Sequence, residues 1–152
     1  MTRLNRVSLS WAMYDWANSA FTTTIMAGFF PVFFKAYWSA GADAGVSTFW
    51  LGVSNSLASL IVAAIAPILG TIADKASVKK RFLLVFAFIG SASSVAFWFV
   101  AQGQWVLAMA VYTLGVLGFS GGNIFYDALL PSASNKKTVD FVSSLGFSLG
   151  YI

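Results

Sequence analysis

Residues 82–101, FLLVFAFIGSASSVAFWFVA, and residues 105–126, WVLAMAVYTLGVLGFSGGNIFY, decide the fold of this chain. Each stretch is apolar and long enough to cross a bilayer as an α-helix, because about 20 helical residues span about 30 Å of hydrocarbon. Only Gln102, Gly103 and Gln104 separate the two stretches. A connection this short joins antiparallel neighbours. The pair therefore predicts a transmembrane helical hairpin.

Two further stretches of the same kind precede the hairpin, at residues 11–34 and 48–73. A fifth apolar stretch, residues 141–152, would reach only about 18 Å as a helix and is too short to span. The sequence therefore predicts one domain over residues 1–152, an all-α, polytopic transmembrane helix bundle of four spans and the incomplete start of a fifth. We expect the chain to be the truncated N-terminal part of a longer protein.

The composition indicates a membrane protein and excludes several chemistries. Hydrophobic residues make up 59% of the chain and charged residues 9%, whereas soluble proteins carry about 25% charged residues. The chain has no Cys, no His and no Glu. Zinc sites and Cys or His nucleophiles are thereby excluded, so we expect no metal, no cofactor and no enzyme activity. No phosphate-binding loop supports ATP-driven transport.

The basic residues predict the topology. Lys35 lies alone on one side of the predicted spans, and the other eight of the nine lie on the opposite side: Arg3, Arg6, Lys75, Lys79, Lys80, Arg81, Lys136 and Lys137. The positive-inside rule assigns that side to the cytoplasm. We therefore expect a multi-pass protein of the cell (inner or plasma) membrane with a cytoplasmic N-terminus. Because the basic residues are scattered over short connections, nucleic acid is not an expected partner.

Aromatic residues at the ends of the stretches suggest two interfacial belts. One consists of Trp11, Tyr14 and Trp16, and the other of Tyr37, Trp38, Trp50 and Trp105. A cleaved signal peptide is the competing interpretation of the first stretch. It is disfavoured because the run is longer than a usual signal core and contains Asp15 and Asn18.

Asp15, Asn18, Ser19 and Thr22 form a polar stripe on the first stretch, at i, i+3, i+4 and i+7 spacing. A central Asp costs about 2.5–3.5 kcal/mol at membrane depth, so this face should meet protein or water. The four residues are candidates for a substrate or ion pathway. Helix packing or interfacial capping is the alternative.

Asn123 and Asp127 lie one turn apart at the end of the fourth stretch, at the same expected depth as Asp15 and Asn18. If the first and fourth spans are neighbours, these groups form an inner polar cluster for substrate, cation or proton. The alternative places Asp127 in the headgroup region before Pro131.

Small residues four apart predict close helix crossings, since helices in lipid associate largely through van der Waals packing. The pairs are Gly118 with Gly122, Ala66 with Gly70, and Gly146 with Gly150. Asn55 and Ser59, also four apart, are an expected interhelical hydrogen-bond pair.

The connection at residues 70–81 resembles the loop signature of the major facilitator superfamily (MFS), Gly-x-x-x-Asp-Arg/Lys-x-Gly-Arg/Lys-Arg/Lys. Gly70, Asp74, Lys75 and Lys79 match, while Ser77 and Val78 depart. In that family the loop is a conformational latch between the two halves, and the resemblance implies this role for the matching residues. A plain positive-inside anchor is the alternative.

Residues 11–21, WAMYDWANSAF, and 28–34, GFFPVFF, resemble the vacuolar amino-acid effluxer branch of the superfamily, which is known from autophagy and has many bacterial members. Residues 126–131, YDALLP, and 143–147, SSLGF, are similar to it as well. The chain corresponds to about the first third of a twelve-span member.

The resemblance implies a facilitator-type secondary carrier that moves a small solute, amino acids in that branch, by alternating access between two six-helix halves. The implied partners are the lipid bilayer, a small-molecule solute and the remaining C-terminal spans. The fourth stretch lacks Arg and Tyr151 stands where the antiporter signature has Pro, so proton coupling and antiport are unsupported. A non-transporting four-span scaffold or regulatory module is the alternative function.

Overall fold

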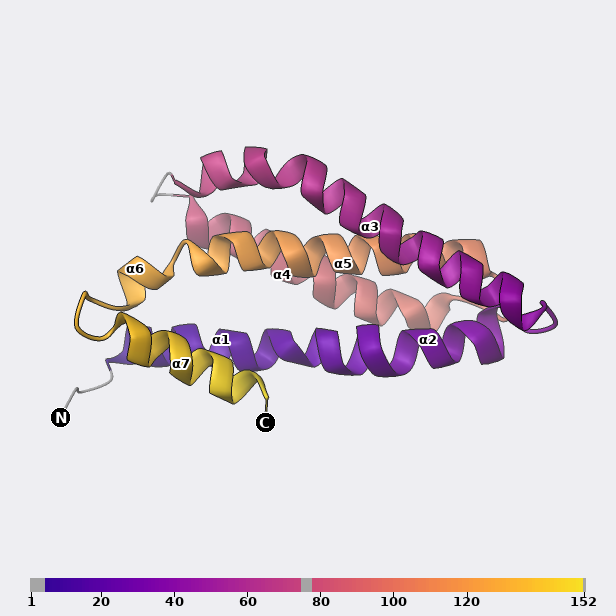
Figure 1. The fold of residues 1–152 in the computed structure, drawn as a ribbon, viewed down its shortest axis with the longest axis horizontal. Helices are drawn as coiled ribbons and strands as arrows, with labels where there is room; N and C mark the ends of the chain where they lie inside the picture. Colours follow the sequence, from indigo (N-terminus) through magenta and orange to yellow (C-terminus); the bar gives the residue numbers. More distant parts are fainter. Residues whose placement is uncertain (1–4, 75–77, 152) are drawn as a thin grey trace.

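The computed structural model describes residues 5–74 and 78–151, and within these ranges the chain contains helices and no strands. Four helices in these ranges are long and apolar enough to cross a membrane: Arg6–Trp38, Ala44–Ala73, Lys79–Phe99 and Trp105–Asp127. Figure 1 shows them as an elongated bundle whose long axes run in roughly the same direction. The predicted fold class, an all-α polytopic transmembrane bundle, is confirmed.

The first long helix is composite. α1 (Arg6–Ala20) is followed by a π-helical segment η1 (Phe21–Phe29), one α-helical turn α2 (Phe30–Phe33) and a second π-helical segment η2 (Phe34–Trp38). Asn5 caps α1, since its side chain accepts a hydrogen bond from Ser8 N at 2.7 Å. No residue of η1 is fully buried. The middle of this helix is therefore its least covered part.

The next helices are set by caps and by one tight turn. α3 (Ala44–Ala73) begins after Asp43, which accepts a hydrogen bond from Gly45 N at 2.8 Å. α4 (Lys79–Ala96) continues into the 3₁₀ turn η3 (Phe97–Phe99). The chain then reverses at Gly103, whose φ of 81° lies in the left-handed region that glycine adopts without strain.

α5 (Trp105–Asp127) is the central helix and packs against both α3 and α4. The one-turn helix α6 (Leu130–Ala133) then leads into α7 (Val139–Gly150), which packs along α1. In Figure 1, α6 and the start of α7 lie at the same end of the bundle as the start of α1. The polar candidates singled out above are carried by the first helix and by α5, and α7 packs beside the first of these.

Two of the predicted glycine crossings are confirmed. A Cβ on Gly118 would lie 2.5 Å from Gly90 N, so the backbones of α5 and α4 touch there. A Cβ on Gly146 would lie 2.7 Å from the Trp11 ring, which places α7 directly on α1. The crossing predicted at Gly70 is wrong, because no described atom lies within 4 Å of a Cβ built there. Gly70 faces open space on α3.

Two residues of the predicted interfacial belts hold the bundle together. Trp11 and Trp38 are buried, and their indole N–H groups donate to Tyr126 O at 3.0 Å and to Val100 O at 3.1 Å. These bonds join the two ends of the first helix to its neighbours. The belts themselves stay a prediction.

Candidate functional site

The first helix and α5 meet through their amide side chains. Asn18 Nδ2 donates to Asn123 Oδ1 at 2.7 Å, joining positions 105 residues apart. Both side chains are partly buried. At membrane depth an amide without a partner is costly, so this bond stabilises the α1–α5 contact. Because neither side chain is fully buried, other polar atoms of the two amides remain exposed beside it.

Asp15, Ser19 and Thr22 face a different neighbour. They line an open groove of about 650 Å³ between α1 with η1 and the end of α7. A Cβ on Gly150 would lie 2.7 Å from Ser19 Oγ and 3.5 Å from Asp15 Oδ2. The two side-chain oxygens therefore converge over the α7 backbone at this glycine.

Asp127 is exposed at the end of α5. The six candidate residues are therefore not brought to one place. Asn18 pairs with Asn123, whereas Asp15, Ser19 and Thr22 line the groove beside α7. Thr22 belongs to η1, in the middle of the first helix.

The predicted latch residues have separate environments. Asp74 is the exposed residue that ends α3, and its backbone N–H donates to Gly70 O at 3.1 Å. Lys75 lies outside the described residues. Lys79, at the start of α4, donates from Nζ to Ala128 O at 2.7 Å. A cation on a carbonyl at a helix C-terminus is favoured by the helix dipole, so Lys79 ties α4 to the end of α5.

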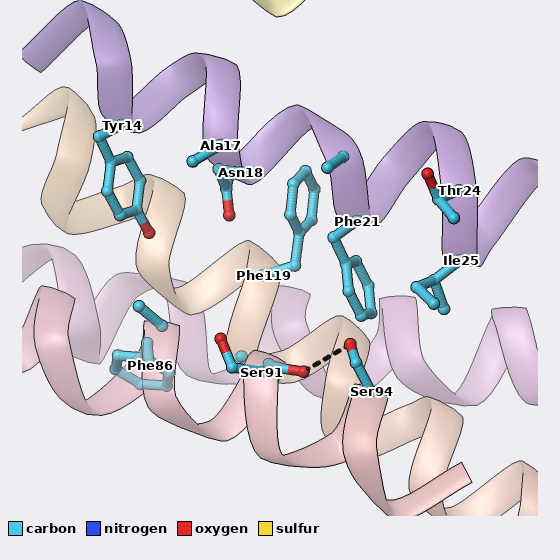
Figure 2. A pocket seen from close by; sticks show the side chains of 14 residues that line it. Tyr14, Ala17, Asn18, Phe21, Thr24, Ile25, Phe86, Ser91, Ser94 and Phe119 are labelled. Atoms are coloured by element: carbon cyan, nitrogen blue, oxygen red, sulfur yellow. Dashed lines mark hydrogen bonds between the residues drawn. The ribbon is translucent and has the colours of Figure 1, made fainter. Parts of the chain in front are cut away.

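A second cavity, of about 450 Å³, lies between the first helix and the α4–α5 pair. Figure 2 shows Tyr14, Asn18 and Phe21 pointing from the first helix toward Phe119 of α5. The ring of Phe21 stacks on that of Phe119 with centroids 5.7 Å apart. On the α4 side Figure 2 shows the Ser94 hydroxyl bonded to Gly90 O, a distance of 3.0 Å.

Sequence reasoning missed the aromatic group beside this site. The ring of Tyr126 stacks on those of Trp11 and Tyr14, with centroids 4.2 and 5.2 Å apart. Its hydroxyl is buried and has no hydrogen-bond partner among the described residues. Trp11, Tyr14, Asn18 and Phe21 recur every three or four residues, which is the spacing of a helix face and the signal that could have identified them.

Asn55 forms an interhelical bond, though not with Ser59. Its Oδ1 accepts from the Tyr112 hydroxyl at 2.6 Å, which links α3 to α5. The predicted interhelical role of Asn55 therefore holds.

Four long apolar helices with polar side chains held between them define a polytopic α-helical membrane protein. The family model described as "Vacuole effluxer Atg22 like" matches residues 5–140, and the chain belongs to this family. The resemblance found in the sequence is thereby confirmed.

Two relatives place the chain further. It is 42% identical over 156 residues to a Bacillus subtilis (strain 168) protein named uncharacterized MFS-type transporter YxiO. It is 31% identical over 147 residues to an uncharacterized protein of Aquifex aeolicus (strain VF5). These matches cover 100% and 95% of this chain but 36% and 35% of the relatives, so the chain spans about a third of their length. No solved structure gives a significant match.

Proposed function

We propose that the chain is the N-terminal part of an MFS-type secondary transporter that moves a small solute, with amino acids as the solute class, by alternating access. The observation that carries the proposal is the polar end of the bundle, where Asn18 bonds Asn123 and where Asp15 and Ser19 converge at Gly150. Polar groups at membrane depth are expensive and are typical of solute and ion pathways. The family and its MFS-type relative support the same function.

The proposed pathway passes along α1, α5 and α7. In this arrangement Asp15, Ser19 and Thr22 line one wall, since they border the α1–α7 groove. Asn123 bonds Asn18 on the side of α1 that faces α5, and Asp127 lies at the end of α5, so the pathway would continue from the groove to this second side of α1. In a transporter built from two halves, the remaining spans supply the facing wall.

We further propose that this polar end faces the cytoplasm of a cell membrane. The positive-inside rule supports this orientation, because the polar end carries Arg6, Lys79 and Lys137 while Lys35 lies in η2 at the opposite end. The connection that follows α3 would then serve as the latch between the halves, with Gly70, Asp74 and Lys79 as its described members.

The competing function is a non-transporting scaffold. It is disfavoured because a scaffold has no need for a carboxylate and hydroxyls along an open groove of about 650 Å³ on a predicted span. The scaffold also predicts that the full-length protein shows no saturable solute flux.

Amino-acid uptake and efflux by the full-length protein in proteoliposomes tests the proposal. We expect Asp15→Asn and Asn18→Ala each to lower the initial rate about tenfold, equivalent to about 1.4 kcal/mol of lost stabilisation. Asp43→Asn is the matched control, because it removes a carboxylate at the α3 N-cap and Asn caps helices equally well. If both pathway variants retain wild-type flux at matched expression, these residues serve packing only.

A further inference from the structure

The groove between α1 and α7 has one-sided charge. Ten described residues line it, and Asp15 is the only charged residue among them. The other polar side chains are the hydroxyls of Ser19, Thr22, Thr23 and Tyr151 and the indole N–H of Trp16. An anionic ligand would find no basic side chain among these residues to compensate its charge, whereas a cation would meet a carboxylate.

Two side-chain acceptors lie close together at one corner of the groove, here called the notch, beside Gly150. Ser19 Oγ and Asp15 Oδ2 lie 2.7 and 3.5 Å from the position that a Cβ on Gly150 would take, so both oxygens lie near the same point of the α7 backbone. An ammonium group carries up to three N–H donors and makes short charge-assisted bonds to carboxylate and hydroxyl oxygens. Two converging acceptors therefore match an ammonium group.

Aromatic rings flank the notch. Trp16, Phe147 and Tyr151 line the groove and are 48%, 64% and 79% exposed. Phe147 and Tyr151 pack edge to face with centroids 4.9 Å apart. Rings within about 6 Å of an organic ammonium attract it and contact its alkyl carbons, a contribution that a hydrated metal ion exploits far less.

We propose that the α1–α7 groove is a binding site for a protonated amine, with the ammonium on Asp15 and Ser19 and its carbon chain against the aromatic rings. The inference deepens the proposed transport function and rests on it, because it names the part of the solute that this wall recognises. The inference adds that the residues lining the groove bind a positively charged group in preference to a negatively charged one.

The test measures electrostatic selectivity directly, without transport. The 152 residues contain no Cys, so a full-length protein whose remaining cysteines are replaced can carry one reporter thiol. Thr22→Cys places it in the groove, and Gln102→Cys places a control in the exposed α4–α5 turn. Purified protein is modified with a trimethylammonium and a sulfonate methanethiosulfonate, and the ratio of the two rates is compared between the positions.

Asp15 and Thr22 are two helical turns apart, about 10 Å along the axis, where one unit charge changes the cation-to-anion rate ratio about fourfold or more. We expect the ratio at Thr22→Cys to exceed that at Gln102→Cys by this factor. Asp15→Asn should abolish the excess and Asp15→Glu should retain it. Protonated n-butylamine should slow modification of Thr22→Cys more than sodium chloride does at the same ionic strength, because sodium chloride acts only by screening the charge.

Equal ratios at the two positions, no effect of Asp15→Asn, or a Thr22→Cys thiol that neither reagent modifies would overturn the proposal. Protection by sodium chloride equal to that by n-butylamine would assign the notch to an inorganic cation and overturn it as well. The outcome is separable from the transport assay. If Asp15→Asn abolishes flux but the groove shows no charge selectivity, the proposed pathway is retained and the amine site is rejected. If the groove shows charge selectivity but the protein gives no flux, the amine site is retained and the transport proposal is rejected.

Discussion

Replacing Gly118 by alanine should separate α4 from α5 and destabilise the bundle. The added Cβ would lie 2.5 Å from Gly90 N and 2.9 Å from both Gly90 Cα and Phe86 O. These are backbone atoms of α4, which cannot turn aside as a side chain can. Restoring an ordinary contact of 3.4 Å from Gly90 N requires the helices to move apart by about 0.9 Å.

The expected magnitude follows from two opposing effects. Overpacking of this kind costs about 1–3 kcal/mol, and alanine regains about 0.5–1 kcal/mol of helix propensity over glycine. The variant should therefore lose about 1–2 kcal/mol of the free energy of unfolding. Gly52→Ala on α3 is the matched control, because no described atom lies within 4 Å of its Cβ position and only the propensity gain applies.

Equilibrium unfolding of the full-length protein in mixed micelles, followed by far-ultraviolet circular dichroism, measures both variants. We expect Gly118→Ala to lower the free energy of unfolding and Gly52→Ala to raise it. A Gly118→Ala protein as stable as Gly52→Ala would show that α4 and α5 do not touch at this position.

Two further experiments test contacts at the polar end. A double-mutant cycle of Asn18→Ala and Asn123→Ala should give a coupling free energy of about 0.6–2 kcal/mol, as interhelical side-chain bonds in membranes do. If the two substitutions are additive in the same unfolding assay, the amides are not paired. Lys79→Gln should lower the free energy of unfolding by about 1 kcal/mol, because it removes the cation from Ala128 O. Lys80→Gln, at an exposed neighbouring residue, should lower it far less. Equal effects would mean that both substitutions act only through the general surface charge.

Hydropathy and length predicted the helical architecture because the bilayer permits few alternatives. A stretch such as residues 82–101 has too few polar groups to remain in water, and its backbone must bond internally in lipid. The depth argument likewise anticipated that Asn18 and Asn123 could meet, since topology places both near the same end. It did not say which side chains would bond, because that depends on how α1 is rotated about its axis.

The polar stripe shows this limit. Neighbouring residues on a helix differ by about 100° in direction, so Asn18 and Ser19 occupy opposite edges of the predicted face. The structure assigns one edge to α5 and the other to α7. The roles of Trp11 and Trp38 were missed for a related reason, since an indole at a helix end serves equally well at a lipid interface or as a donor to a buried carbonyl.

The first helix is held to its neighbours at both ends by hydrogen bonds from indole side chains. One indole bond holds it at Trp11 and another at Trp38, with the π-helical segment η1 between them and none of its residues fully buried. η1 is held by partly buried contacts, such as the stacking of Phe21 on Phe119, and helices bend where π-helical turns interrupt the α-helical hydrogen bonds. A force on the groove would therefore bend the centre of the helix while both indole hydrogen bonds stay in place. The geometry around Thr22 can thus change without separating the helices of the bundle.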